Sequence, residues 1–218
     1  KKKKIKLVPL PILLVTPETD LVLGVALQAY FKLGNNPKTY TSNASSNIQY
    51  TTRKQLISWT KWDLFLKGNA LRFNGELKYQ KYPNKYWGIG YNTPNANETN
   101  YSYKQVLFNF KWLTAIKGTP AFLGISYRLN TQFNIIPIDT PNLLTDVDRP
   151  LGYNDFLNNG IGLAAMWDTR DHNIFPYKGV WAQLTAHYFI DRDNFVNEKN
   201  NQFFSMQLDV REYFSFFK

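Results

Sequence analysis

This chain of 218 residues lacks cysteine and any long apolar run. The absence of cysteine suits an exported protein, for which stray thiols are a hazard. The longest apolar run, Leu7–Val15, contains Pro9 and Pro11 and is far shorter than the roughly 20 apolar residues that a membrane-spanning helix needs. Together with a mean hydropathy of -0.40, this excludes a helical membrane protein.

Histidine is also scarce, since it occurs only as His172 and His187. A metal site needs several His, Asp or Glu side chains at ligand spacing. Asp168, Asp171 and His172 are near in sequence, but a turn held by hydrogen bonds and an Asp168–Arg170 salt bridge is the simpler interpretation. We therefore expect no enzyme activity, no catalytic residue, no metal and no cofactor in this segment.

Positive charge is in excess, with 26 Lys and Arg against 16 Asp and Glu and a net charge of +10. Such an excess indicates nucleic-acid binding when it gathers in a patch. Here it is scattered through alternating stretches, and Lys1–Lys4 is the only cluster. We therefore expect no nucleic-acid partner, and attribute the excess to a polar barrel interior or to anionic lipid headgroups.

What the chain does contain is a strong two-residue alternation of apolar and polar side chains. Four stretches show it best: Asp20–Leu33, Leu71–Lys81, Ala121–Phe133 and Phe203–Phe217. This period is typical of β-strands with one apolar face. The stretches run to about 11–14 residues, which exceeds the usual length of a soluble strand and is enough for a tilted strand to cross a membrane.

The residues within these stretches point to a particular fold class. Aromatic residues make up 17% of the chain, and outer-membrane barrels need aromatic girdles at both interfaces. Large charged side chains occupy the polar parity in mid-strand, as a polar interior inside an apolar exterior requires. The sequence predicts an all-β, antiparallel transmembrane β-barrel of the outer-membrane type, with a soluble β-sandwich or up-and-down barrel as the alternative.

Ten strands are predicted. They are Leu7–Thr16, Asp20–Leu33, Ala44–Arg53, Gln55–Leu66, Ala70–Tyr82, Tyr103–Ala115, Ala121–Phe133, Gly160–Asp168, Val180–Asp191 and Gln202–Phe217. The fourth alternates poorly over Trp59–Phe65, so a bulge or a change of register is expected there.

The connections between predicted strands alternate in length. Tight turns follow the fourth and sixth strands, and long loops follow the fifth and seventh: Lys67–Asn69, Lys117–Thr119, Pro83–Asn100 and Ile135–Asn158. Outer-membrane barrels have short periplasmic turns and long outer loops. This parity places both chain ends and Asp168–Gly179 on the periplasmic side, with Gly34–Asn43 as one longer connection there.

Three motifs stand at the ends of predicted strands. The first is Asp-x-Arg-Asp followed by Pro-x-x-Gly, here Asp168, Arg170, Asp171, Pro176 and Gly179. The second is Pro9, Pro11 and Thr16–Thr19, and the third is Tyr79–Gly90, which includes Tyr86, Trp87, Gly88 and Gly90 on an expected extracellular loop. In their order and placement these motifs resemble the bacterial surface antigen barrel of the BamA/TamA family, in its Bacteroidetes-type form. The resemblance runs over nearly the whole chain.

The resemblance implies a sixteen-stranded barrel, of which about ten strands are found here. The family's Arg-Gly-Phe/Tyr loop motif and its periplasmic POTRA repeats have no counterpart in the chain. We therefore expect the first part of a larger barrel in mature or excised form, or a variant that lacks these parts, with residues 1–6 as a basic periplasmic linker and residues 7–218 as the partial barrel domain.

The resemblance also implies a function at the bacterial outer membrane. Barrels of this family insert other barrels into that membrane or move polypeptide across it, at a weakly paired seam between their first and last strands. The implied partners are outer-membrane lipid and lipopolysaccharide, nascent outer-membrane protein clients and subunits of an assembly complex.

Pro9 and Pro11 offer a local reason for a weak seam. Alternate N–H groups along a strand point to the same side, and neither proline has an N–H. If that side faces the seam, two closing hydrogen bonds are absent; alternatively, the prolines shape a bend before the strand begins.

Two other functions stay open. A similar barrel can anchor an upstream soluble enzyme, such as a phosphatase or a patatin-like lipase, and Lys1–Lys4 would then be the linker to it. The chain could also be a plain porin or adhesin barrel.

Overall fold

The computed structural model describes residues 5–17, 19–91, 93–139, 155–192 and 202–215, so residues 1–4 of the expected linker 1–6 lie outside the described residues. Ten strands account for most of the described chain, with two short 3-10 turns, η1 (Lys67–Asn69) and η2 (Asn95–Asn97). The strands are β1 (Lys6–Thr16), β2 (Asp20–Phe31), β3 (Ser42–Thr51), β4 (Leu56–Leu66), β5 (Leu71–Tyr86), β6 (Thr99–Ala115), β7 (Ala121–Pro137), β8 (Phe156–Asp168), β9 (Gly179–Arg192) and β10 (Gln202–Tyr213).

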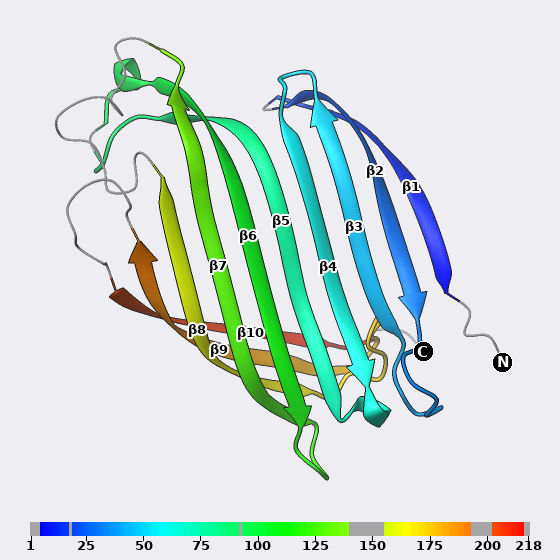
Figure 1. Ribbon diagram of the computed structural model, residues 1–218. Coiled ribbons are helices and arrows are strands. Elements are labelled where there is room, and N and C mark those ends of the chain that lie inside the picture. Colours follow the sequence, from blue (N-terminus) through cyan, green and yellow to red (C-terminus); the bar gives the residue numbers. More distant parts are fainter. Residues whose placement is uncertain (1–4, 18, 92, 140–154, 193–201, 216–218) are drawn as a thin grey trace.

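All ten strands belong to one antiparallel sheet, in which each strand pairs with its neighbours in sequence (Figure 1). β1 pairs only with β2 and β10 only with β9, so the described sheet is open and these two strands are its edges. The predicted all-β antiparallel fold is confirmed, but the ten strands do not close into a barrel. Among the described residues, no helix has the length and apolar character needed to cross a membrane.

Successive connections alternate between two ends of the sheet. One, the turn end, carries the connections 32–41, 67–70, 116–120 and 169–178. At the other, the loop end, lie the connection 52–55, the ends of β1, β5 and β7, and the starts of the strands that follow these three. The start of β1 and the end of β10 lie at the turn end. The Asp168–Gly179 motif therefore shares one end of the sheet with both described chain ends, as the predicted strand order required.

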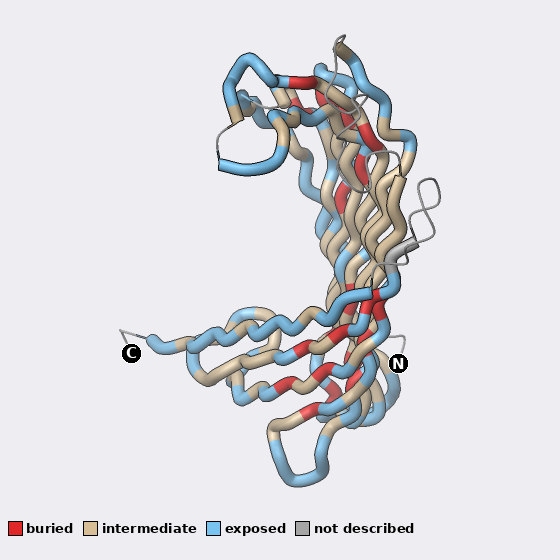
Figure 2. Tube along the Cα trace, turned by 90° about the vertical axis from the view of Figure 1, so that its left-hand side faces the viewer, coloured by how far each residue is buried: buried red, intermediate tan, exposed pale blue. Residues whose placement is uncertain are grey.

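The two faces of the sheet differ in chemistry. One parity of the strands forms an apolar outer face, where Leu13, Leu163 and Met206 are each between 67% and 71% exposed. The sheet is strongly curved (Figure 2). The other parity lines its concave side, because Arg72 on β5 reaches Asp168 on β8 past β6 and β7. That concave face is polar over its middle and carries a small apolar core near the turn end, formed by Leu113, Phe122, Ala164 and Met166.

Small side chains on β8 allow the sheet to bend. Gly160, Gly162 and Ala164 occupy successive concave positions of β8. The strands that follow, β9 and β10, run at a steep angle to β1–β7 (Figure 1). A Cβ on Gly162 would overlap the carbonyl oxygen of Ala186, and one on Gly160 would meet the ring of Phe189. The neighbouring strand therefore fills the space that larger residues would need.

The irregularity predicted for the fourth strand is wrong. β4 pairs with β3 and β5 without a break, and the shift of register lies instead between β6 and β7, near Ser102 and Lys104. The poor alternation over Trp59–Phe65 arises because the concave face is itself mixed. Phe65 packs edge-on against Tyr40 near the turn end, while Asp63 beside it is ion-paired.

The hairpin of β5 and β6 reaches further than its sequence predicts. Pro83 pairs with Ser102 inside the ladder, so the connection is shorter than the predicted Pro83–Asn100 loop. β4 begins at Leu56, opposite Lys81, and beyond that point β5 has a neighbour on one side only. A proline is tolerated there because its missing N–H falls on an unpaired edge.

Candidate functional site

The Asp168–Gly179 turn is held by its own side chains. Asp168 accepts two hydrogen bonds from the Arg170 guanidinium, at 2.8 Å from Nε and 2.7 Å from Nη2. Asp171 Oδ1 accepts the backbone N–H groups of Tyr177 at 2.9 Å and Lys178 at 3.2 Å. The structure thus shows the salt bridge and hydrogen bonds that the sequence suggested for this turn.

Two further motif residues and one histidine shape the same turn. Gly179 has a φ of 110°, and a Cβ there would overlap the carbonyl oxygen of Thr169, so only glycine fits. His172 Nδ1 accepts the N–H groups of Ile174 at 3.1 Å and Phe175 at 3.0 Å. Pro176 lies partly exposed between these contacts.

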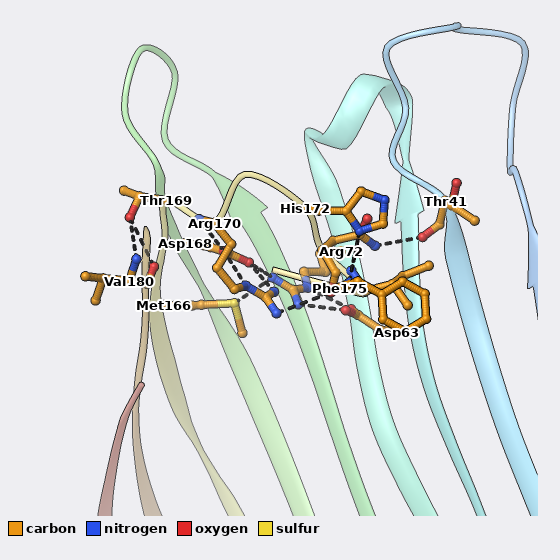
Figure 3. Close-up of polar contacts among 12 residues, drawn as sticks. Thr41, Asp63, Arg72, Met166, Asp168, Thr169, Arg170, His172, Phe175 and Val180 are labelled. Atoms are coloured by element: carbon orange, nitrogen blue, oxygen red, sulfur yellow. Dashed lines mark hydrogen bonds and ion pairs between the residues drawn. The ribbon is translucent and has the colours of Figure 1, made fainter. Parts of the chain in front are cut away.

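Arg72 on β5 connects this turn to the opposite part of the concave face (Figure 3). Its guanidinium donates to both carboxylate oxygens of Asp63 at 2.7 Å and to Asp168 Oδ2 at 3.0 Å, and Nη1 lies 2.9 Å from the sulfur of Met166. β6 and β7 separate β5 from β8 in the sheet, so this link crosses the concave side.

We call Asp63, Arg72, Asp168 and Arg170 the charge cluster. Two carboxylates and two guanidiniums alternate in it, so its formal charges cancel. The Arg72 side chain is only 3% exposed and lies over the rings of Phe65 and Phe122, at 4.8 Å and 6.0 Å. Each guanidinium of this neutral cluster is paired with a carboxylate, Arg72 is buried and the other three side chains are 11–15% exposed. The geometry of the cluster is that of a structural tie.

A second contact extends the tie to the early strands. Asn173 Nδ2 donates to the carbonyl oxygen of Thr41 at 2.8 Å, between residues 132 apart in sequence. The turn therefore touches the β2–β3 connection as well as β5. An open cavity of about 760 Å³ lies beside it, lined mainly by the η1 turn and the 116–120 turn, with Asp168 and Arg170 at its edge.

Acidification tests the turn's internal bonds. Hydrogen bonds from the backbone of Tyr177, and then of Lys178, hold the pKa of the Asp171 carboxyl below its usual value. Because the pKa is lowered by folding, the stabilisation is complete above the ordinary pKa of about 3.9 and is lost as pH falls through the lower folded value. We expect the amide NMR shifts of Tyr177 and Lys178 to stay constant from pH 7 to pH 4.5 and to move only below that range.

Asp171→Asn is the control for this titration, because an amide oxygen still accepts both N–H groups but does not ionise. The shifts of Tyr177 and Lys178 should then stay constant throughout. A midpoint at or above the ordinary carboxyl pKa in the unaltered protein would contradict the role assigned to Asp171.

The two sequence-predicted prolines lie inside β1, where Pro9 pairs with Leu27 and Pro11 with Val25. One hydrogen bond shows to which side the backbone groups of the two prolines point. The N–H of Thr52 donates to Leu21 O at 3.0 Å, so Leu21 faces β3 and its partner on β1 faces away from β2. By alternation, the N and C=O positions of both prolines face the free edge of β1.

The free edge of β1 is therefore deficient in donors. Leu7, Pro9, Pro11, Leu13 and Val15 share the outward orientation, and the two prolines in the middle offer carbonyl acceptors without N–H donors. The apolar side chains of Leu7, Leu13 and Val15 are exposed beside them. The spacing of two between Pro9 and Pro11 thus places both prolines along the free edge of the sheet.

β10 forms a different kind of edge. The N–H of Thr169 donates to Val180 O at 2.8 Å, so Val180 faces β8 and its partner Glu212 faces outward. Phe204, Met206, Leu208 and Val210 share this orientation and keep both donor and acceptor. The two edges of the sheet therefore differ, one complete and one interrupted by proline.

The third motif lies at the loop end, away from the turn. Tyr86 ends β5 opposite Thr99, and Trp87 follows it with 37% exposure. Gly88 and Gly90 have φ values of 108° and 109°, a conformation that favours glycine. The structure does not bring this motif together with the charge cluster or with the β1 prolines.

Reasoning from the sequence missed Arg72, Asp63, Asn173 and Thr41 as partners of the turn. The available signal was slight: Arg72 and Asp63 stand on the polar parity near strand ends. Across the described ranges, no three His, Cys, Asp or Glu side chains gather in a way that could hold a metal ion. In comparisons with known proteins, no family model, no curated protein and no solved structure matches the chain.

Proposed function

We propose that the chain forms part of an outer-membrane β-barrel of the BamA/TamA type, which assembles outer-membrane proteins or moves polypeptide across the membrane at its first strand. The observation that carries this proposal is the free edge of β1, where Pro9 and Pro11 remove two adjacent outward donors from a long strand. Ten long strands with an exposed apolar face support a membrane setting.

The energetics of such an edge depend on its surroundings. In a bilayer each unpaired backbone polar group costs several kcal/mol, so the edge of β1 needs a partner strand. A partner gains about 1 kcal/mol for each hydrogen bond, and two of these are missing at Pro9 and Pro11. The partner is therefore held less firmly than any pair of strands within the sheet, and it can be exchanged for an incoming client strand.

The side chains of β1 suit this exchange. Val8, Leu10 and Leu14 on its concave parity are exposed and apolar, as are Leu7 and Leu13 on the other parity. β1 is thus apolar on both faces, whereas the middle strands have one polar face. A strand of this kind can move sideways toward lipid without burying a charge. The proposed partners are client strands, assembly subunits and the surrounding lipid and lipopolysaccharide.

Restoring the two donors should slow strand exchange. We expect Pro9→Ala/Pro11→Ala to reduce about thirtyfold the dissociation rate of a fluorescent peptide of alternating Leu and Thr bound at the edge, since two hydrogen bonds add about 2 kcal/mol. The chain has no cysteine, so Leu13→Cys provides a single thiol whose disulfide to a cysteine in the peptide reports the site of pairing.

The matched control is Leu10→Ala/Ile12→Ala, two substitutions on the same strand whose N–H groups already face β2. Its dissociation rate should match that of the unaltered protein. If the proline variant releases the peptide at the original rate, the edge is not the site of exchange. A protein that conducts ions in planar bilayers and never captures the peptide would instead be a plain porin.

A further inference from the structure

The concave face carries a second feature, a cluster of basic side chains that belongs to neither strand edge. We propose that Lys111, Arg128 and His187 form a binding site for a small anion bearing a phosphate group. These residues line one open cavity of about 620 Å³ on the concave face. A cavity of this size lies within the range that small-molecule sites occupy.

The register of the strands brings the three residues together. Lys111 on β6 stands opposite Ser126 on β7, and Arg128 lies two residues further along the same face of β7. His187 on β9 reaches across β8, where its Nε2 lies 2.8 Å from Ser126 Oγ. Gly162 is the β8 residue between them, and its missing side chain opens the path.

The charges around this cavity do not balance. Besides His187, five Lys and Arg residues and two acidic residues line it: Lys61, Lys78, Lys111, Arg128, Arg211, Glu76 and Asp209. Lys61 pairs with Glu76 at 3.5 Å, and Arg211 pairs with Asp209 at 2.6 Å. In the described part of the chain, no carboxylate lies within salt-bridge distance of Lys78, Lys111 or Arg128. Three positive charges are thus left over on one wall.

The leftover charges act on each other. Lys111 and Arg128 are close enough to repel one another, and both act on His187. Lys111 Nζ donates a long hydrogen bond of 3.4 Å to an amide oxygen, Asn74 Oδ1. Partly buried like charges are unfavourable unless an anion or water compensates them. The charge cluster at the turn end shows the contrasting case, in which every cation has its acid.

The available donors suit phosphate oxygens. Arg128 presents a planar fork that binds two oxygens at once, and Lys111 presents a point charge. Ser126 and Thr185 add hydroxyl groups on the same wall, both buried. A phosphate has enough oxygens to engage these groups together, and its negative charge of about two offsets most of the surplus.

Calorimetric titration with sodium pyrophosphate, on the whole chain in non-ionic detergent at fixed low salt, tests the site. We expect binding by the unaltered protein and at least a tenfold loss of affinity in Lys111→Gln/Arg128→Gln, since hydrogen bonds to charged groups are the strong ones. The matched control is Lys81→Gln/Lys104→Gln, which removes two charges from a cross-strand pair on the outer face. Its affinity should change less than twofold.

Three outcomes decide the proposal. An equal loss in both double variants would mean a diffuse charge effect and would overturn it, as would the absence of binding to any phosphate. A short-chain phosphatidylglycerol that binds where pyrophosphate does not would identify a lipid headgroup as the source. Urea unfolding adds an independent check: Lys111→Gln/Arg128→Gln should be at least as stable as the unaltered protein, because it removes a repulsive pair.

Discussion

Replacing Arg72 with methionine is expected to lower the free energy of unfolding by about 3–5 kcal/mol, the effect of removing one member of a buried ion pair. The side chain is almost fully buried, and its loss leaves Asp63 without a cation partner inside the concave face. Asp168 suffers less, because Arg170 still donates two hydrogen bonds to it. The destabilisation should therefore come mainly from Asp63.

Urea unfolding followed by tryptophan fluorescence, in one detergent, measures this effect. Arg53→Met is the matched control, because Arg53 pairs with Asp20 at 2.8 Å but both side chains are about half exposed. Exposed pairs contribute about 0–1 kcal/mol. Equal losses in the two variants would show that the buried position of Arg72 has no special weight.

A second substitution separates the charge from the packing. In Arg72→Met/Asp63→Asn the stranded carboxylate becomes a neutral amide, and we expect more than half of the lost stability to return. If the double variant is no more stable than Arg72→Met, the loss comes from the packing of the guanidinium between Phe65 and Phe122 rather than from the charge.

The partners of the turn within the charge cluster were not predicted from the sequence. The positions of the strands follow from the local sequence, because apolar and polar side chains alternate within most of them. All ten strands were predicted, although the fourth alternates poorly and β1 is apolar on both faces. The bond from Arg72 to Asp168 joins residues 96 apart and exists only because the sheet curves. No local pattern contains that curvature, so the turn was recognised while its partners were not.

The prolines of β1 show an intermediate case. Their spacing of two predicted that both would face the same side, and the alternative of a bend before the strand was equally consistent with the sequence. Whether that side is the free edge or the side facing β2 was decided by the hydrogen bond between Thr52 and Leu21, which lies two strands away from the free edge. The side to which the backbone groups of an edge strand point is thus set by the hydrogen bonds of the whole ladder. The sequence of that strand alone does not determine it.

Gly162 lies in the bent strand β8, packs against the backbone of β9 and separates Ser126 from His187. Gly162→Ala is expected to lower the free energy of unfolding by about 1–3 kcal/mol. The added methyl group would overlap the carbonyl oxygen of Ala186, a backbone atom that side-chain rotation cannot remove. β8 and β9 must then move apart, which separates Ser126 from His187 and weakens pyrophosphate binding as well as folding.

Gly160→Ala tests whether this effect is specific. Its methyl group would meet the ring of Phe189, a side chain rather than a backbone atom, so we expect a smaller loss of stability and little change in pyrophosphate affinity. Both variants add the same group to the same strand, two residues apart on the same face. If they destabilise the protein equally, the bend does not depend on backbone contact at Gly162. A larger effect at Gly162 would instead mean that the sharp turn of β8–β10 and the contact from Ser126 to His187 have one physical origin, the missing side chain between them.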